Sequence, residues 1–464
     1  MPHHLLHSIG DGPLKALPSG TIALPPQTPI RFDIASGGCW YGHGFAHRQP
    51  YPLNAEPVVN AAFAVNNAQS PMWLCSAGYA ILAETTASLC VRFNEGGGGI
   101  FELSCGEPLS LRIFREGNLP AAHRALMSHL GWPGPLPLPM TADASSSDAS
   151  SADVAGDCLF CTWTQFPRCI NQERVLAMAR EIRRRGYPCS FFIIDDRWEA
   201  AFGELAFSND FPDPRAMVEE LHALGFRVLL WVTPFVNREA ATFGPLAERG
   251  ILVPAADDFG SGGMGSVSKK GGRSARRLAE PAPTSERHPV PASGGPGPAL
   301  LKWWGGTAGL VDLTNPVGRD CFRDQLRRLR NDTGVDGFKI DGGDAKYQPP
   351  HAQSAWHSYC GESGHADKLL AVAEEVAPGA CETRTVWLSQ SRNIIWRQGG
   401  KDSHWGIDNG LRAMVNLALH MGLMGYDIRK RSNRDEWDKW DEEEDGGVTR
   451  KATRNGRGRK SLTG

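Results

Sequence analysis

The chain lacks the features that mark membrane-spanning, secreted and nucleic-acid-binding proteins. Its 464 residues contain no run of about 20 apolar residues, which a membrane-spanning helix needs. The first residues, MPHHLLHSIGDGPLK, have neither the basic start nor the long apolar stretch of a signal peptide, so the compartment stays unknown. The 49 Lys and Arg balance 51 Asp and Glu, for a net charge of −2. We therefore expect a soluble protein without a nucleic-acid partner.

Cofactor motifs are also missing. Eleven cysteines in a chain of this length do not make a disulfide framework. Cys158 and Cys161 form a CxxC, but no second pair stands at zinc-finger spacing, and CLFCTW is typical of the start of a strand. The string GSGGMG (260–265) matches GxGxxG, yet no strand leads into it and no helix follows it. The sequence indicates neither a metal nor another cofactor.

The composition does provide for a large core and for aromatic surfaces. Hydrophobic residues make up 41% of the chain, and 14 Trp are present, whose indoles suit flat apolar ligands such as sugar rings. Residues 1–135 contain short β-rich runs broken by Gly and Pro, such as ASLCVRF (88–94) and GIFELSC (99–105). This spacing predicts an N-terminal β-sandwich. The Ser/Ala/Asp-rich segment within 136–157 is typical of a linker.

From residue 158 to 428, apolar strands alternate with amphipathic helices. NQERVLAMAREIRRRG (171–186) places Val175, Met178, Ala179 and Ile182 on one stripe, and SFFIIDD (190–196) follows as a buried strand. Unbroken apolar strands between helices predict a parallel sheet covered on both faces. Several such units without a dinucleotide fingerprint favour a (β/α)8 TIM barrel, an α/β fold, over a doubly wound sheet.

Two segments interrupt or end this pattern. Residues 254–300 are rich in Gly, Ser, Pro and basic residues without periodicity, which predicts a disordered surface insertion. Residues 429–464 join an acidic run to a basic run, with no core-forming pattern. The barrel is therefore expected to stop after about seven strands, with a truncated or misread end or a solvated tail.

Candidate catalytic side chains follow the predicted strands, at the barrel end where active sites lie. Four strands carry them: Asp195 and Asp196 end one, Trp231 lies near the tip of the next, Lys339 and Asp341 end the third, and Asp427 ends the last. A single terminal Asp is often only a helix cap, but three on separate strands are not explained that way.

Carboxylates beside aromatic side chains, without a metal-ligand cluster, favour glycoside hydrolysis, in which one carboxylate attacks the anomeric carbon and another acid protonates the leaving oxygen. A metal-dependent hydrolase and a lyase that uses Lys339 stay open as alternatives at this point.

Several strings together resemble glycoside hydrolase family 31, and most closely its branch that contains the myogenesis-regulating glycosidase. They recur in family order across roughly residues 40 to 428, which makes them far more specific than any single motif. The matching strings are WYG (40–42), FFIIDDRWEAAFGELAFSNDFPD (191–213), LLWVTPFVN (229–237), WWGGTAGLVDLTNP (303–316), DGFKIDGGDAKYQP (336–349), ETRTVWLSQSRN (382–393) and KDSHWGIDNGLR (401–412).

The resemblance implies a β-sandwich, a (β/α)8 barrel and a retaining, exo-acting α-glycosidase of carbohydrate substrates. It implies that Asp341 is the nucleophile. It favours a terminal α-galactoside over an α-glucoside. The residues that it places around the sugar in the −1 subsite are Asp195, Asp196, Trp231, Lys339, Arg384, Trp405 and Asp427.

One position departs from the family pattern. Counting forward from Arg384 and back from Trp405, the family's acid/base Asp falls at residue 400, which is Gly here. Asp402, two residues further on, is either a structural or substrate-holding residue or a substitute acid. The alternative function is therefore a catalytically impaired sugar-binding relative.

Other readings of these residues stay open. Asp195 and Asp196 are strand neighbours, so one of them is expected to be structural. Trp231 suits either barrel packing or a ligand, and Lys339 suits an ion pair with Asp341. At least one of Trp303 and Trp304 is expected in the core.

Overall fold

The computed structural model describes residues 19–34, 38–44, 48–63, 69–132, 159–167, 169–255, 297–348, 363–426 and 428–430. Several predictions fall outside these residues: the linker at 136–157, Cys158, GSGGMG and most of the insertion at 254–300, Asp427, and the tail at 429–464 apart from its first two residues.

Two antiparallel sheets build the N-terminal part. Their strand orders are β1-β9-β6-β5-β3 and β2-β8-β7-β4. The strands expected at 88–94 and 99–105 are β7 and β8, which pair directly. The strands are β1 Gly20–Leu24, β2 Ile30–Asp33, β3 Trp40–Gly42, β4 Val58–Phe63, β5 Met72–Cys75, β6 Tyr79–Glu84, β7 Leu89–Phe93, β8 Ile100–Cys105 and β9 Leu109–Arg115.

An aromatic core joins the two sheets. In β8, Phe101, Leu103 and Cys105 are buried while the residues between them are not, as expected when one face of a strand lies against a core. The Phe101 ring lies 4.9 Å from the ring of Trp73, which belongs to the other sheet. Trp40 packs edge-on against the Phe101 ring. The predicted β-sandwich is therefore confirmed.

Seven parallel strands form the sheet of the second part, in the order β10-β11-β12-β16-β17-β18-β19. The order follows the chain, as in a (β/α) barrel, and the predicted barrel fold with about seven strands is confirmed. The strands are β10 Leu159–Cys161, β11 Phe191–Ile194, β12 Arg227–Val232, β16 Gly337–Ile340, β17 Cys381–Thr383, β18 Ile395–Arg397 and β19 Ile428–Lys430.

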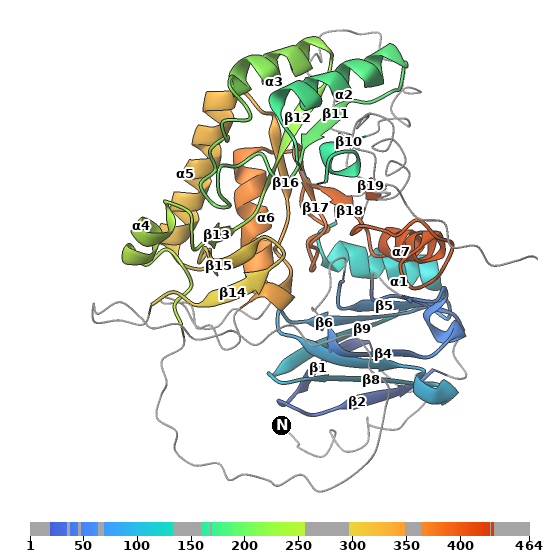
Figure 1. Cartoon of the computed structure of the whole chain (residues 1–464). Coiled ribbons are helices and arrows are strands. Elements are labelled where there is room, and N and C mark those ends of the chain that lie inside the picture. Colours follow the sequence, from blue (N-terminus) through green and yellow to red (C-terminus); the bar gives the residue numbers. More distant parts are fainter. Residues whose placement is uncertain are drawn as a thin grey trace, which may run out of the picture.

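Amphipathic helices cover the outer face of this sheet (Figure 1). The helix expected at 171–186 begins after Asn171, whose side chain accepts a hydrogen bond from the Arg174 N–H at 2.8 Å. Gly186, at φ +69°, follows its last turn. The helices are α2 Gln172–Arg184, α3 Pro214–Ala223, α4 Phe243–Glu248, α5 Pro316–Thr333, α6 Gly364–Val376 and α7 Leu411–Leu423.

The segment of the chain between β12 and α5 forms a small antiparallel sheet beside the barrel strands. It contains β13 Phe235–Asn237, β14 Leu300–Trp303 and β15 Gly306–Leu310 in the order β13-β15-β14. Its buried side chains form a separate aromatic cluster with Trp231. The described ends of the predicted insertion lie here, in a bridge between Pro254 and Pro298 and in the first residue of β14.

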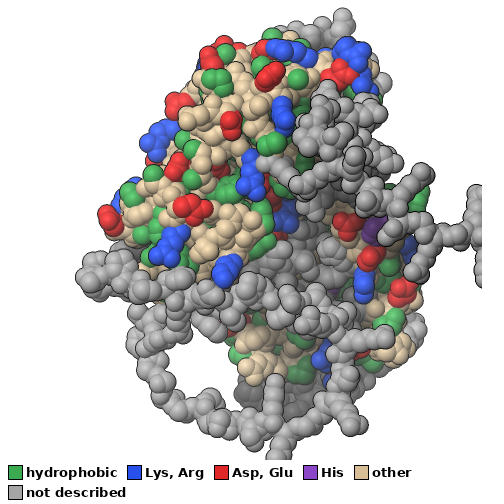
Figure 2. All heavy atoms as spheres, viewed as in Figure 1, with side chains coloured by type: hydrophobic (Ala, Val, Ile, Leu, Met, Phe, Trp, Pro, Cys, Tyr) green, Lys and Arg blue, Asp and Glu red, His purple; other side chains and the backbone are tan. Residues whose placement is uncertain are grey.

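On the face shown in Figure 2, basic and acidic side chains intermix over the outer helices. Arg180 of α2 pairs with Glu220 of α3 at 2.6 Å, and Arg327 of α5 pairs with Glu375 of α6 at 2.8 Å. In the described part of the chain, every helix is too short or too polar to cross a membrane.

Helix α1 (Leu119–His129) lies between the sandwich and the barrel sheet (Figure 1). Its buried residues Leu126 and Met127 belong to the same apolar core as the barrel strands. Two buried histidines lie at this junction. The Gly42 N–H donates to His420 Nδ1 at 3.0 Å, and His420 Nε2 lies 2.8 Å from the Pro50 carbonyl oxygen, so His420 is held as the neutral tautomer. The Trp73 indole donates to His43 Nδ1 at 3.3 Å.

We expect this junction to make the protein lose stability in acid. Burial, with a smaller effect of His420, lowers the pKa of His43 to about 3, and burial lowers that of His420 to about 4. Below pH 6.5 both histidines are protonated in the unfolded chain but remain neutral in the folded chain until the pH approaches their lowered pKa values. The free energy of unfolding should therefore fall by up to about 1.4 kcal/mol per pH unit for each histidine.

The measurement is urea unfolding between pH 7.5 and pH 4.5 for the wild type and for His43→Gln and His420→Gln. Each variant should show a shallower decline with falling pH, whatever its stability at pH 7.5. An unchanged slope in both variants would contradict the assignment.

Candidate active site

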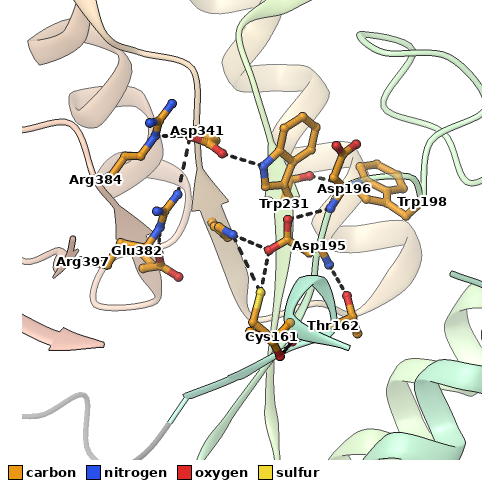
Figure 3. A network of polar contacts seen from close by, with 12 residues as sticks. Cys161, Thr162, Asp195, Asp196, Trp198, Trp231, Asp341, Glu382, Arg384 and Arg397 are labelled. Carbon is orange, nitrogen blue, oxygen red and sulfur yellow. Dashed lines mark hydrogen bonds and ion pairs between the residues drawn. The ribbon is translucent and has the colours of Figure 1, made fainter. Parts of the chain in front are cut away.

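The candidate side chains gather at the C-terminal ends of adjacent parallel strands (Figure 3). Asp195 and Asp196 follow β11, Trp231 belongs to β12, Asp341 follows β16, and Arg384 follows β17. Apart from the half-buried Arg227 at the start of β12, these strands are buried along their length, so the core sets their positions and holds the first residues beyond them at the mouth of the sheet. The structure therefore brings together side chains that are as many as 189 positions apart in the sequence.

Asp341 is the most strongly held carboxylate of the group. Its backbone N–H donates to the Val232 oxygen at 3.0 Å, which continues the ladder between β12 and β16. Arg384 Nε donates to Asp341 Oδ1 at 2.5 Å, and the Trp231 indole donates to Oδ2 at 3.1 Å. A second guanidinium, that of Arg397 at the end of β18, lies 3.5 Å from Oδ1.

These contacts keep Asp341 ionised. Burial alone would raise its pKa, but the positive charges of Arg384, Arg397 and Lys339 outweigh burial and lower the pKa well below the usual range. The side chain is still 13% exposed, so it is not sealed from a ligand. An ionised, oriented and accessible carboxylate is suited to nucleophilic attack.

Arg384 bridges two carboxylates. Its Nε holds Asp341, and its Nη2 lies 2.8 Å from Asp344 Oδ2. Asp344 is fully buried, three residues after Asp341, and was not among the predicted site residues. The sequence did offer a signal for Asp344: it ends the string DGGD (341–344), and the segment just after a barrel strand lines the active site. Arg397 was also missed, and its own partner is the fully buried Glu382 of β17.

Replacing Asp344 by asparagine should lower kcat for an aryl α-glycoside by about 10²-fold, because a small displacement of a positioned group costs that much. Arg384 would keep its bond to Asp341 but lose the partner that fixes its other end. Asp344→Glu should restore part of the rate, and KM should change far less than kcat. The matched control is Asp367→Asn, which removes one of the two carboxylate partners of Arg392, at 2.6 Å in a half-exposed pair, and leaves the other, Glu374. Equal losses in both variants would contradict a positioning role.

Asp195 and Asp196 have different surroundings, and their carboxylates point away from each other in Figure 3. Asp195 Oδ2 accepts from the Cys161 thiol at 2.6 Å and pairs with Lys339. The expected ion pair of Lys339 with Asp341 is therefore wrong: Lys339 reaches past β12 to Asp195. Cys161, half of the CxxC, belongs to this buried polar group.

Asp196 has buried carboxylate oxygens that find no hydrogen-bond donor among the described residues. It is 3% exposed, and its nearest cationic group is Arg197, whose Nε lies 3.9 Å away. Burial, partly offset by Arg197, raises the pKa of Asp196 to about 6. A buried acceptor without a donor is costly unless a ligand supplies one. Asp195 is thus tied to Cys161 and Lys339, whereas the Asp196 carboxylate has no such bonds within the described residues.

Aromatic side chains close one side of the site. Trp231 is buried, which fits barrel packing, and its indole N–H donates to Asp341, so its role as a ligand contact stays a prediction. Trp303 is buried and donates to Asn237 Oδ1 at 2.8 Å, which confirms that at least one member of the Trp pair is in the core. Trp304 is 43% exposed, with the Arg384 guanidinium 5.6 Å from its ring centre. Sequence reasoning did not single out Trp304 as a ligand contact.

The loop after β18 carries Gly400, Asp402 and Trp405. Gly400 lies three residues beyond Arg397, and its carbonyl oxygen accepts from Asn409 Nδ2 at 3.2 Å. Asp402 is exposed and also accepts from Asn409 Nδ2, at 3.0 Å. Within the described residues no contact joins Asp402 to the Asp341 group. Trp405 is 81% exposed, and Asp427 lies outside the described residues.

Comparisons with known proteins match both parts of the chain. The model of the glycosyl hydrolases family 31 TIM-barrel domain matches residues 157–429, and that of the myogenesis-regulating glycosidase N-terminal domain matches residues 20–110. The mouse myogenesis-regulating glycosidase is 30% identical over 281 residues, which are 60% of this chain and 34% of that protein. The chain thus spans about a third of the length of this relative.

Two further comparisons are more distant. The alpha-xylosidase XylQ of Lactiplantibacillus pentosus is 24% identical over 186 residues, which are 39% of this chain and 19% of that protein. The crystal structure of a GH31 alpha-xylosidase from a soil metagenome, complexed with xylose, has a TM-score of 0.59 at 19% identity. The match covers 85% of this chain and 51% of that one. This structural similarity supports the fold.

Proposed function

Because the chain belongs to glycoside hydrolase family 31, we propose that it is a retaining, exo-acting α-glycosidase that acts on terminal α-linked hexosides. The observation that carries the proposal is the setting of Asp341, an accessible carboxylate kept ionised by Arg384 and Arg397. In a double displacement, Asp341 attacks the anomeric carbon and forms a glycosyl ester, which an incoming water then hydrolyses with net retention.

The other side chains of the site are assigned either to substrate binding or to positioning the groups that bind. The donor-free oxygens of Asp196 would accept hydroxyl groups of the sugar ring, while Asp195 and Lys339 keep the floor of the site in place. Trp231 and Arg384 hold the nucleophile in one orientation, and the exposed Trp304 offers an apolar face to the ring. The predicted roles of Trp405 and Asp427 stay predictions.

An α-galactoside is the favoured substrate and an α-glucoside the next. The N-terminal match at residues 20–110 to the myogenesis-regulating branch supports the first, because the sequence resemblance to that branch favours galactose. The names of other relatives, such as the alpha-xylosidase XylQ, make α-xylosides the necessary third member of any substrate panel.

Gly400 is the specific observation behind an alternative function. It stands where the family pattern has its acid/base Asp, and Asp402 is tied to Asn409 in an exposed loop. A positioned acid contributes about 10²–10⁴-fold to the rate. The alternative is therefore a catalytically impaired relative that binds sugars, and Asp402 as a substitute acid is the less favoured reading.

The test is hydrolysis of p-nitrophenyl α-galactoside, α-glucoside and α-xyloside by the full chain. Turnover highest on the galactoside and absent in Asp341→Ala would support the proposal. No turnover on any of them, with sugar binding still detected by tryptophan fluorescence, would overturn it in favour of a sugar-binding protein.

A further inference from the structure

One buried carboxyl group close to the site has no part in the mechanism above. Glu199 lies in the loop that follows β11 and is 9% exposed. Its Oε2 accepts from the Gly203 N–H at 2.9 Å and from the Leu205 N–H at 3.0 Å. Its Oε1 is buried and finds no hydrogen-bond partner among the described residues. One oxygen thus closes the turn at residues 203–205, while the other has no donor.

The backbone of this turn is strained, so it needs an anchor. Leu205 has φ +51°, a left-handed conformation that residues with a side chain rarely adopt. Gly203 has φ +93°, and a Cβ added there would lie 2.6 Å from the Val236 Cα. Because Glu199 accepts hydrogen bonds from both strained residues, its side chain offsets the cost of this conformation.

The turn places an aromatic ring against the neighbours of the nucleophile. The Phe202 carbonyl oxygen accepts from the Asn237 N–H at 2.9 Å. The Phe202 ring packs edge-on against Trp231, with ring centres 5.8 Å apart, and against Trp303 at 5.0 Å. The Trp231 indole in turn donates to Asp341 (Figure 3). Loss of the anchor should therefore let Phe202 move away and leave Trp231 free to shift.

The surroundings of Glu199 favour its neutral form. Burial, reinforced by the negative charges of Asp196 and Glu204 and partly offset by the two backbone hydrogen bonds, raises its pKa to about 8. Arg197, the cation of the same loop, is exposed and lies 3.9 Å from Asp196. The strand β13, against which the turn packs, carries no charged side chain.

Ionisation of Glu199 should release the turn. An uncharged oxygen without a partner is far less costly to bury than a charged one. Above about pH 8 the carboxylate gains by moving to water, which breaks its hold on Gly203 and Leu205.

We propose that Glu199, as a neutral acid, is a positioning residue of the active site. It seats Phe202 against Trp231, whose indole holds Asp341. This inference rests on the proposed function, because its effect on rate requires Asp341 to act as the nucleophile.

The experiment measures galactose release from p-nitrophenyl α-galactoside by the full chain between pH 5.5 and pH 9.5. The wild-type kcat should fall above about pH 8, by about tenfold per pH unit once the neutral form is depleted. Glu199→Gln keeps the acceptor oxygen and cannot ionise, so it should retain most of the kcat at pH 7 and lose this alkaline decline. Glu199→Ala should lower kcat at pH 7 by about tenfold and change KM less.

The matched control is Glu204→Gln. Glu204 lies in the same loop and also accepts a backbone hydrogen bond, from the Ala241 N–H at 2.8 Å. This variant should keep the alkaline decline, since Glu199 is still present.

Hydrogen exchange of the peptide that spans residues 199–207 gives a readout that needs no turnover. After correction for the intrinsic exchange rate, its protection should fall between pH 7 and pH 9 in the wild type but not in Glu199→Gln. An equal alkaline decline in both proteins, or wild-type protection that does not change with pH, would overturn the positioning role and leave the glycosidase proposal standing. No galactose release at any pH would overturn the glycosidase proposal, and exchange alone would then support or overturn the anchoring of the turn by Glu199.

Discussion

Replacing Gly400 by aspartate is expected to raise kcat/KM for an α-galactoside with a poor leaving group, such as methyl α-galactoside, by about 10²–10⁴-fold. The reason is that Gly400 occupies the acid/base position of the family pattern. It lies in the loop that follows Arg397, and Arg397 contacts Asp341. The structure permits the change, because an added Cβ meets open space among the described residues and the backbone is not strained.

The measurement compares galactose release by the wild type, Gly400→Asp and Gly400→Asn. The aspartate variant should also lose its dependence on a good leaving group and gain a basic limb in its pH profile, as the new carboxyl group titrates. Gains of equal size in the asparagine variant would show that filling the space, rather than supplying an acid, is what matters.

The second large effect is expected for Asp341→Asn, which should lower kcat for aryl α-galactosides by at least about 10⁴-fold. The amide keeps the shape of the side chain but cannot form the glycosyl ester, and it leaves Arg384 and Arg397 without their shared anion. Because removing one partner of a buried pair also destabilises a fold, binding must be measured in parallel.

Galactose titration by tryptophan fluorescence provides that control. Binding by Asp341→Asn within about tenfold of the wild type, together with the loss of turnover, would separate a missing nucleophile from a damaged site. Retention of more than a few per cent of the wild-type rate would contradict the role of Asp341.

The fold, and the gathering of the candidate side chains at one end of its strands, were largely predictable because they depend on local patterns. Buried strands that end in Asp195 and Asp341 must place these residues at one end of a parallel sheet. The apolar stripe of α2 ended where Gly186 predicted. Arg384 and Trp231 reached Asp341 because their strands are close neighbours in the sheet.

The partners of the side chains were less predictable because they depend on three-dimensional packing. Lys339 pairs with Asp195 rather than Asp341, since inward side chains from alternate barrel strands, here β11 and β16, share one layer. Asp344 and Arg397 belong to the same charge network, but neither stands in a pattern that requires it.

A strand-like run was expected from Trp303, but the pairing of β13, β14 and β15 into a small sheet was not predicted. Its strands are short, β15 contains two glycines, and β15 pairs with β13, which lies more than 60 positions earlier in the chain, while β14 pairs with β15. No period of apolar residues marks such pairing. The exposed position of Trp304 follows from this sheet and could not be separated from that of Trp303 by sequence alone.

The most direct test of the account is to identify the residue that becomes glycosylated. The full chain would be treated with a fluorinated α-galactosyl fluoride that slows both chemical steps, digested, and analysed by peptide mass spectrometry. The account predicts a single galactosyl adduct on the peptide that contains Asp341, absent in Asp341→Asn. An adduct on another carboxylate, or release of fluoride without any adduct, would contradict it.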